Sequence, residues 1–201
     1  TEGFESARLI KPYKEKGLGS MHRGHVLTTA FSYDLPFGRG QHWLGGLPAV
    51  GDALLGGWQL SGILTLQTGS PFNVSVAGDV ANCGCGNRPN RLGNGNLDRG
   101  ERSIQRWFDV SAFAVPTTFT NGNAGRNIMI GPALQNLDLA LLKNFRIRER
   151  SRVQLRWEAF NSLNHANFGF PATTINIPAT VGRISSALDP RIMQFSLKWI
   201  F

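Results

Sequence analysis

The stretch RIMQFSLKWIF (Arg191–Phe201) decides the fold class of this chain. Its side chains alternate between two faces with a period of two, which is the signature of a β-strand. One face is apolar throughout, and the run ends on an aromatic residue. The apolar face carries Met193, Phe195, Leu197, Trp199 and Phe201, and the opposite face carries Gln194, Ser196 and Lys198.

Length and composition determine how such a strand could be used. The chain has 201 residues, of which 41% are hydrophobic, 17% are charged and 24 are glycine. No run approaches the roughly 18 apolar residues of a membrane helix, so any membrane crossing must be made by strands. A strand of about 9–11 residues that ends on an aromatic at the membrane interface is typical of a bacterial outer-membrane barrel. We therefore expect an all-β protein located in the bacterial outer membrane.

A second alternating stretch, RVQLRWEAF, precedes the first by about thirty residues. Its apolar face holds Val153, Leu155 and Trp157, and its other face is strongly charged. That polar face is too charged for the core of a β-sandwich, and it suits a water-filled lumen.

Three further strands are predicted upstream, and the links between consecutive strands, counted back from the carboxy-terminus, are long, short, long and medium. Long links then fall on one side of the membrane and shorter ones on the other, as in natural barrels, with residues 1–21 in a further outward loop. Lys143 falls on the lipid side if alternation is strict, and either a bulge or the end of the membrane belt near Leu142 would relieve this. The predicted strands lie near residues 23–35, 58–69, 136–147, 151–161 and 191–201.

Five strands cannot close a barrel, and single-chain bacterial barrels have even strand numbers. We therefore expect residues 1–201 to form a partial antiparallel transmembrane β-barrel with long extracellular loops, as the carboxy-terminal fragment of a larger barrel domain. The edge strands of such an arc would be exposed, so we do not expect the piece to exist alone.

The formal net charge of +8 raises the possibility of a nucleic-acid partner. The basic residues are scattered through loops and turns, and they are not interleaved with the aromatic rings that stacking on bases would need. We expect no nucleic acid as a partner. An electropositive rim that attracts anions or lipopolysaccharide phosphates fits the pattern better.

Candidate catalytic and metal sites are sparse. Cys83 and Cys85 are separated by one residue, which is cramped for a direct disulfide, so a loop crosslink of some kind or partners elsewhere in the protein remain open. His22 and His25 have a metal-compatible spacing without a third ligand. No serine occupies a G-x-S-x-G elbow, and the Gly93–Gly95 stretch is typical of a turn. We expect no enzyme activity, no cofactor and no metal.

The strand pattern also predicts which side chains face the lumen and which anchor the barrel. The lumen-facing groups could touch a substrate or a plug, or they could only solvate the wall and pair across strands. Aromatic side chains at the periplasmic rim are expected to act as interface anchors, namely Trp58, Trp199 and Phe201. The lumen-facing polar candidates are Arg152, Gln154, Arg156, Glu158, Gln194 and Lys198.

Five segments of the chain carry a family resemblance. They are GWQLSGILTLQTGSPFNVSV, WFDVSAF, GRNIMIGPALQNLDLALLKNF, LRWEAFNSLNHANFG and GRISSALDPRIMQFSLKWIF. In this order they resemble the carboxy-terminal barrel of Oar-like TonB-dependent transporters, from about His22 to Phe201. The resemblance implies a 22-stranded barrel of which this chain supplies the last five strands. It also implies a plug domain and a TonB contact in the part of the protein ahead of this chain.

The resemblance implies a function as well. The chain would supply wall, lumen lining and external loops for energised passage of a substrate through an outer-membrane receptor. The apolar row of Phe195, Leu197, Trp199 and Phe201 would be the signal that the barrel-insertion machinery recognises. Two alternatives stay open: a soluble secreted β-sandwich used for binding or adhesion, and a passive pore.

Overall fold

The computed structural model describes residues 16–84, 86–148 and 151–201. Most of the predicted outward loop of residues 1–21 therefore lies outside the described residues, as do Cys85 and residues 149–150 of the predicted short link. The chain divides into two compact units, which are described separately. The sheet unit comprises residues 26–66, 134–167 and 189–201, and the loop unit comprises the described residues up to 25 together with 67–133 and 168–188.

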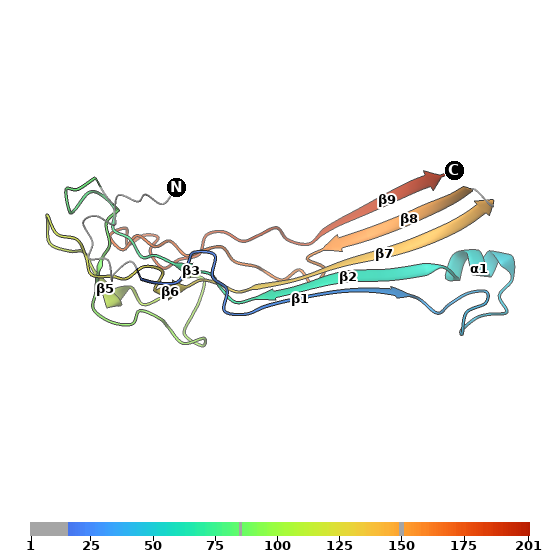
Figure 1. Ribbon diagram of the computed structural model, residues 1–201, viewed down its shortest axis with the longest axis horizontal. Helices are drawn as coiled ribbons and strands as arrows, with labels where there is room; N and C mark the ends of the chain where they lie inside the picture. Colours follow the sequence, from blue (N-terminus) through green and yellow to red (C-terminus); the bar gives the residue numbers. More distant parts are fainter. Residues whose placement is uncertain (1–15, 85, 149–150) are drawn as a thin grey trace. The chain divides into compact units, whose positions relative to one another are not determined.

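The sheet unit is built on one five-stranded sheet in the order β1-β2-β7-β8-β9. Neighbouring strands run in alternating directions, as the arrows in Figure 1 show. Each strand begins and ends within three residues of its predicted bounds, and β1 and β9 form the open edges. The strands are β1 (Val26–Asp34), β2 (Trp58–Gln67), β7 (Leu134–Arg148), β8 (Ser151–Phe160) and β9 (Ile192–Ile200).

Strand register settles the position of Lys143. The pairing of β7 with β8 runs without interruption from Leu139 to Arg146, and the register shifts only between Arg146 and Arg148. Lys143 is directly opposite Leu155, so it stays on the apolar face of the sheet. A bulge near Leu142 is therefore not how the chain accommodates this lysine.

Gly62 in β2 makes room for two large side chains on the apolar face. A Cβ atom at this position would lie 2.7 Å from the Phe31 ring and 2.8 Å from Leu139 Cδ2. The glycine thus lets side chains from β1 and β7 meet across the strand between them, which accounts for a residue that otherwise weakens a strand.

The connection between β1 and β2 contains the helix α1 (Ala49–Leu55). The helix is seven residues long. Asp52 Oδ1 accepts the backbone N–H of Arg39 at 2.5 Å, which ties the helix to the preceding loop. The indole Nε1 of Trp58 donates to Leu54 O at 3.0 Å, which ties its carboxyl end to β2.

The loop unit has its own secondary structure and core, although the sequence predicted only long loops there. β3 (Pro71–Phe72) pairs with β6 (Met129–Ile130), and β4 (Asn90–Arg91) pairs with β5 (Phe113–Ala114). A 3₁₀ turn, η3 (Val110–Ala112), precedes β5. The buried cluster comprises Phe72, Val74, Val76, Phe108, Ala112, Phe113, Met129 and Ile175.

Polar side chains fasten this unit through backbone hydrogen bonds. Asn127 donates its backbone N–H to Asn73 Oδ1 and its side-chain Nδ2 to Leu18 O, both at 2.6 Å. The indole of Trp107 donates to Ile130 O at 2.9 Å. Because these bonds satisfy backbone groups that irregular loops leave open, they allow the unit to bury an apolar cluster. Within the described residues, no helix is both long enough and apolar enough to cross a membrane.

Candidate functional site

The six predicted lumen-facing side chains share one face of β8 and β9. The register places Glu158 opposite Gln194 and Gln154 opposite Lys198, while Arg152 lies opposite Ile200. Residues that face one another across antiparallel strands point to the same side of a sheet. Arg156 alternates with Gln154 and Glu158 along β8, so it completes this polar face.

Several of these groups bond to one another. Glu158 accepts a hydrogen bond from the Gln194 amide across the strand pair, and it also forms an ion pair with Arg156 on its own strand. Gln154 Nε2 donates to Asn144 Oδ1 of β7 at 3.0 Å. Polar contacts on one face thus join three strands. Cross-strand pairing was one of the two roles that the sequence allowed for these side chains.

The network still has capacity to bind other groups. The side chain of Arg156 is 44% exposed, and a guanidinium carries five N–H donors in a planar fork. Its contact with Glu158 leaves donors available for a carboxylate or phosphate. The polar face can therefore hold and orient an anionic or hydrogen-bonding group while remaining bonded to the wall.

The opposite face of β8 and β9 is apolar, and its β9 side chains are exposed. Phe195, Leu197 and Trp199 are each at least 67% exposed, and Phe201 is also exposed. They lie opposite the apolar side chains of β8, since Leu155 pairs with Leu197. An apolar surface of this extent is not expected to face water, and it fits a lipid contact.

Two predicted aromatic anchors lie at one end of the sheet. Trp58 is the first residue of β2, and Trp199 is the penultimate residue of β9. Antiparallel alternation brings the start of β2 and the end of β9 to the same end of the sheet (Figure 1). Phe201 follows β9 directly at that end.

Sequence reasoning missed the environment of Lys143. This side chain is only 1% exposed, and its Nζ lies 5.5 Å from the centre of the Trp58 ring and 5.2 Å from that of Phe145. The sequence did carry one signal, because Lys143 is a charged residue in an otherwise apolar row of β7. The pattern could not show which side chains would cover it.

The loop unit contains a tight acidic turn at Asp79. Its carboxylate accepts the backbone N–H of Gly84 at 2.9 Å and that of Cys83 at 3.1 Å, and these bonds hold the pKa of Asp79 below its usual range. Cys83 is disulfide-bonded. Within residues 16–84, 86–148 and 151–201, no three His, Cys, Asp or Glu side chains gather as a metal site would require.

A second acidic group in the loop unit is Asp109, which precedes the 3₁₀ turn. The Ser111 hydroxyl donates to Asp109 Oδ1 at 2.8 Å, and this bond is the main reason that the pKa of Asp109 is lowered. Arg106 adds an exposed ion pair at 3.5 Å. The carboxylate therefore acts as a cap for the turn that leads into β5.

Comparison with known proteins adds a family match. A family model described as "Outer membrane beta barrel domain" matches residues 1–194, which is nearly the whole chain. No curated protein and no solved structure matches the chain.

Proposed function

The chain belongs to the outer membrane β-barrel domain family, and from this premise we propose that it forms part of a TonB-dependent transporter. Its place is the bacterial outer membrane, and the five-stranded sheet is a segment of barrel wall. In the proposed function, this segment supplies wall, lumen lining and external loops for a substrate that is moved at the expense of the proton-motive force.

The observation that carries the proposal is the two-sided sheet. One face of β8 and β9 is a bonded row of polar groups, and the other is an apolar row that is exposed along β9. A wall with water on one side and lipid on the other requires this arrangement. The five segments that resemble Oar-like TonB-dependent transporters support the narrower assignment within the family.

In the proposed function, the polar row of β8 and β9 contacts the substrate or the plug. Arg156 and Lys198 would meet a substrate or the plug on the lumen side, and Glu158 would fix the orientation of the Arg156 guanidinium through their ion pair. The plug domain and the TonB contact are assigned to a part of the parent protein ahead of this chain. No bond is made or broken in this role, so transport and not catalysis is proposed.

Two partners follow from the remaining surfaces. The exposed apolar row of Phe195, Leu197, Trp199 and Phe201 is proposed as the surface that the barrel-insertion machinery engages. The described part of the loop unit carries nine Lys and Arg against four Asp and Glu. This positive balance favours attraction of lipopolysaccharide phosphates.

The test uses the full-length parent in its own outer membrane. Uptake of a panel of iron chelates, glycans and peptides is measured with TonB present and with TonB deleted. The proposal predicts at least one compound whose uptake needs both the parent protein and TonB. Arg156→Ala should reduce that uptake without reducing the amount of assembled protein. Uptake that is unaffected by TonB deletion would instead indicate a passive pore.

A further inference from the structure

Lys143 presents a problem for a membrane wall. It lies on the apolar face of β7, opposite Leu155, and a lysine exposed to lipid destabilises a barrel. The structure removes it from exposure, because only 1% of its surface remains accessible. The question is which parts of the chain provide the cover and what their outer surface then meets.

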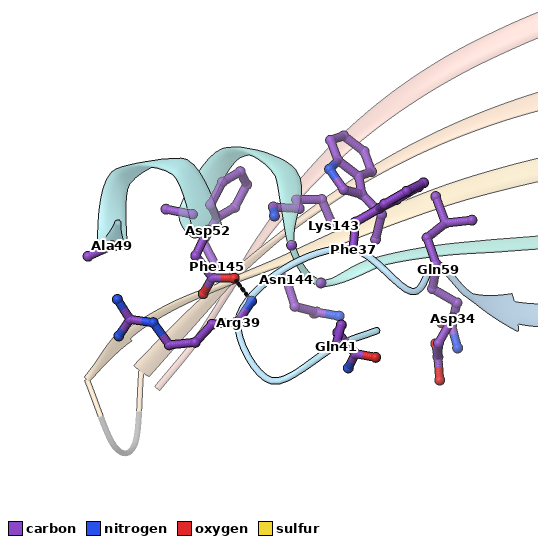
Figure 2. A pocket seen from close by; sticks show the side chains of 15 residues that line it. Asp34, Phe37, Arg39, Gln41, Ala49, Asp52, Gln59, Lys143, Asn144 and Phe145 are labelled. Atoms are coloured by element: carbon purple, nitrogen blue, oxygen red, sulfur yellow. Dashed lines mark hydrogen bonds between the residues drawn. The ribbon is translucent and has the colours of Figure 1, made fainter. Parts of the chain in front are cut away.

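Two aromatic rings and the β1–β2 connection surround this ammonium. Figure 2 shows the Lys143 side chain extending toward α1, with the Phe145 ring beside it. Gly57, at the end of the connection, lies so near that a Cβ there would be 4.0 Å from Lys143 Nζ. A cavity of about 670 Å³ adjoins the group, and its lining includes Lys143, Asp52 and Ala53.

The connection is held together internally, and it is fastened to the sheet through Trp58. Asp52 holds the backbone of Arg39, and Trp58 contacts both Lys143 by its ring and Leu54 O by its Nε1. The same tryptophan therefore covers the lysine and anchors the helix. Phe37 and Trp43 pack with ring centres 5.5 Å apart within the connection.

Several apolar side chains of the connection are exposed. The helix α1 has no buried residue, and Val50 is 73% exposed and Leu54 63% exposed. Leu55 and Trp43 are exposed as well. Val50 and Leu54 are four residues apart on the helix and therefore share a face, and exposed apolar side chains that share a face mark an interaction surface.

We propose that the β1–β2 connection is a membrane-interface element that covers Lys143 and inserts Val50, Leu54 and Leu55 into the phospholipid leaflet at that end of the wall. The partner is a lipid surface, because Trp58, which bonds the helix at Leu54 O, also contacts Lys143 on the apolar face of the sheet. It also lies at the end of the sheet where Trp199 provides a second interfacial aromatic. The inference rests on the outer-membrane location and is independent of TonB-driven transport.

The first test measures lipid contact at Leu54. The full-length parent carrying Leu54→Cys is labelled with a nitrobenzoxadiazole fluorophore and placed in vesicles of phosphatidylethanolamine and phosphatidylglycerol. Quenching by nitroxide-labelled phospholipid reports lipid contact, and quenching by iodide reports water. Leu197→Cys is the control for lipid and Gln41→Cys the control for water, and heat-modifiability on gels confirms that each variant is folded.

The expected result is lipid quenching at Leu54 that is similar to Leu197 and several-fold greater than at Gln41. Iodide quenching at Leu54 as strong as at Gln41 would overturn the proposal, since the helix would then lie in water. Protection from both quenchers would also overturn it, because another part of the parent or a second copy would then cover the helix.

The second test asks whether the helix shields Lys143. Leu54→Asp should lower the fraction of heat-modifiable protein in the outer membrane, and the loss should be smaller in a Lys143→Met background. Leu92→Asp, at an exposed leucine of the loop unit, is the matched control and should change nothing. Equal losses from Leu54→Asp in both backgrounds would contradict the shielding role.

Discussion

At the scale of single residues, Gly62 is a position in the wall with no room for a side chain. Gly62→Val should destabilise the protein by about 1–3 kcal/mol, because the added carbons would overlap the Phe31 ring and Leu139. The change is measured as the urea midpoint at which the heat-modifiable form is lost. Gly46→Val is the matched control, since nothing lies within 4 Å of a Cβ at Gly46. Equal midpoints for the two variants would show that Gly62 is not a close-packed position.

Asp79 gives a pH-dependent prediction at the same scale. Its folded pKa is lowered chiefly by the backbone N–H of Gly84, so its contribution is complete above the unfolded pKa of about 4 and is lost as the pH falls through the folded value. Hydrogen exchange of the 79–84 turn, normalised to an unstructured peptide at each pH, should therefore become faster in acid. Asp79→Asn should remove most of this pH dependence. A wild-type turn whose protection is unchanged down to about pH 2 would contradict the role given to the carboxylate.

At the scale of the element, the two faces of β8 should differ in how well they tolerate a new arginine. Leu155→Arg places a cation on the apolar face and should cost about 2–4 kcal/mol. Gln154→Arg places it on the polar face and should change stability by no more than about 0.5 kcal/mol. The two variants are compared by their assembled fractions in the outer membrane. Equal tolerance at the two positions would mean that the faces do not meet different surroundings.

The strands could be predicted from the sequence because their information is local. A period of two places Leu155 and Gln154 on opposite faces whatever their partners are, and the family match agrees with the barrel interpretation. The hydrogen bonds of the polar face could not be predicted in this way. The contacts of Glu158 with Gln194 and of Gln154 with Asn144 depend on strand register, which the pattern does not determine.

The loop unit and the cover of Lys143 could not be predicted for a related reason. Phe72 and Val74 alternate within a short run, but they pack against Met129 and Ile175, which are distant in sequence. Such contacts leave no periodic signal in the intervening residues. For Lys143, the sequence showed the conflict with the apolar row, and only the tertiary structure shows that Trp58 and Phe145 cover it.

At the scale of the whole molecule, the two compact units should be separable in their stability. Phe108 is fully buried in the core of the loop unit, with 0% exposure. Phe108→Ala should cost this unit about 3–5 kcal/mol and increase its cleavage by added protease. The heat-modifiable barrel should persist, because the sheet has its own strand pairing. Loss of heat-modifiability in this variant would show that the wall needs the loop core.

The central claim is that the sheet is a wall with lipid on one face and water on the other. The most direct measurement is a nitroxide scan of residues 193–200 in the full-length parent, reconstituted in phospholipid vesicles. Collisions with oxygen report lipid, and collisions with a water-soluble nickel complex report water. The account predicts a period of two, with oxygen access highest at Met193, Phe195, Leu197 and Trp199. Apolar positions that are reached by neither reagent would instead indicate a protein core and would contradict the account.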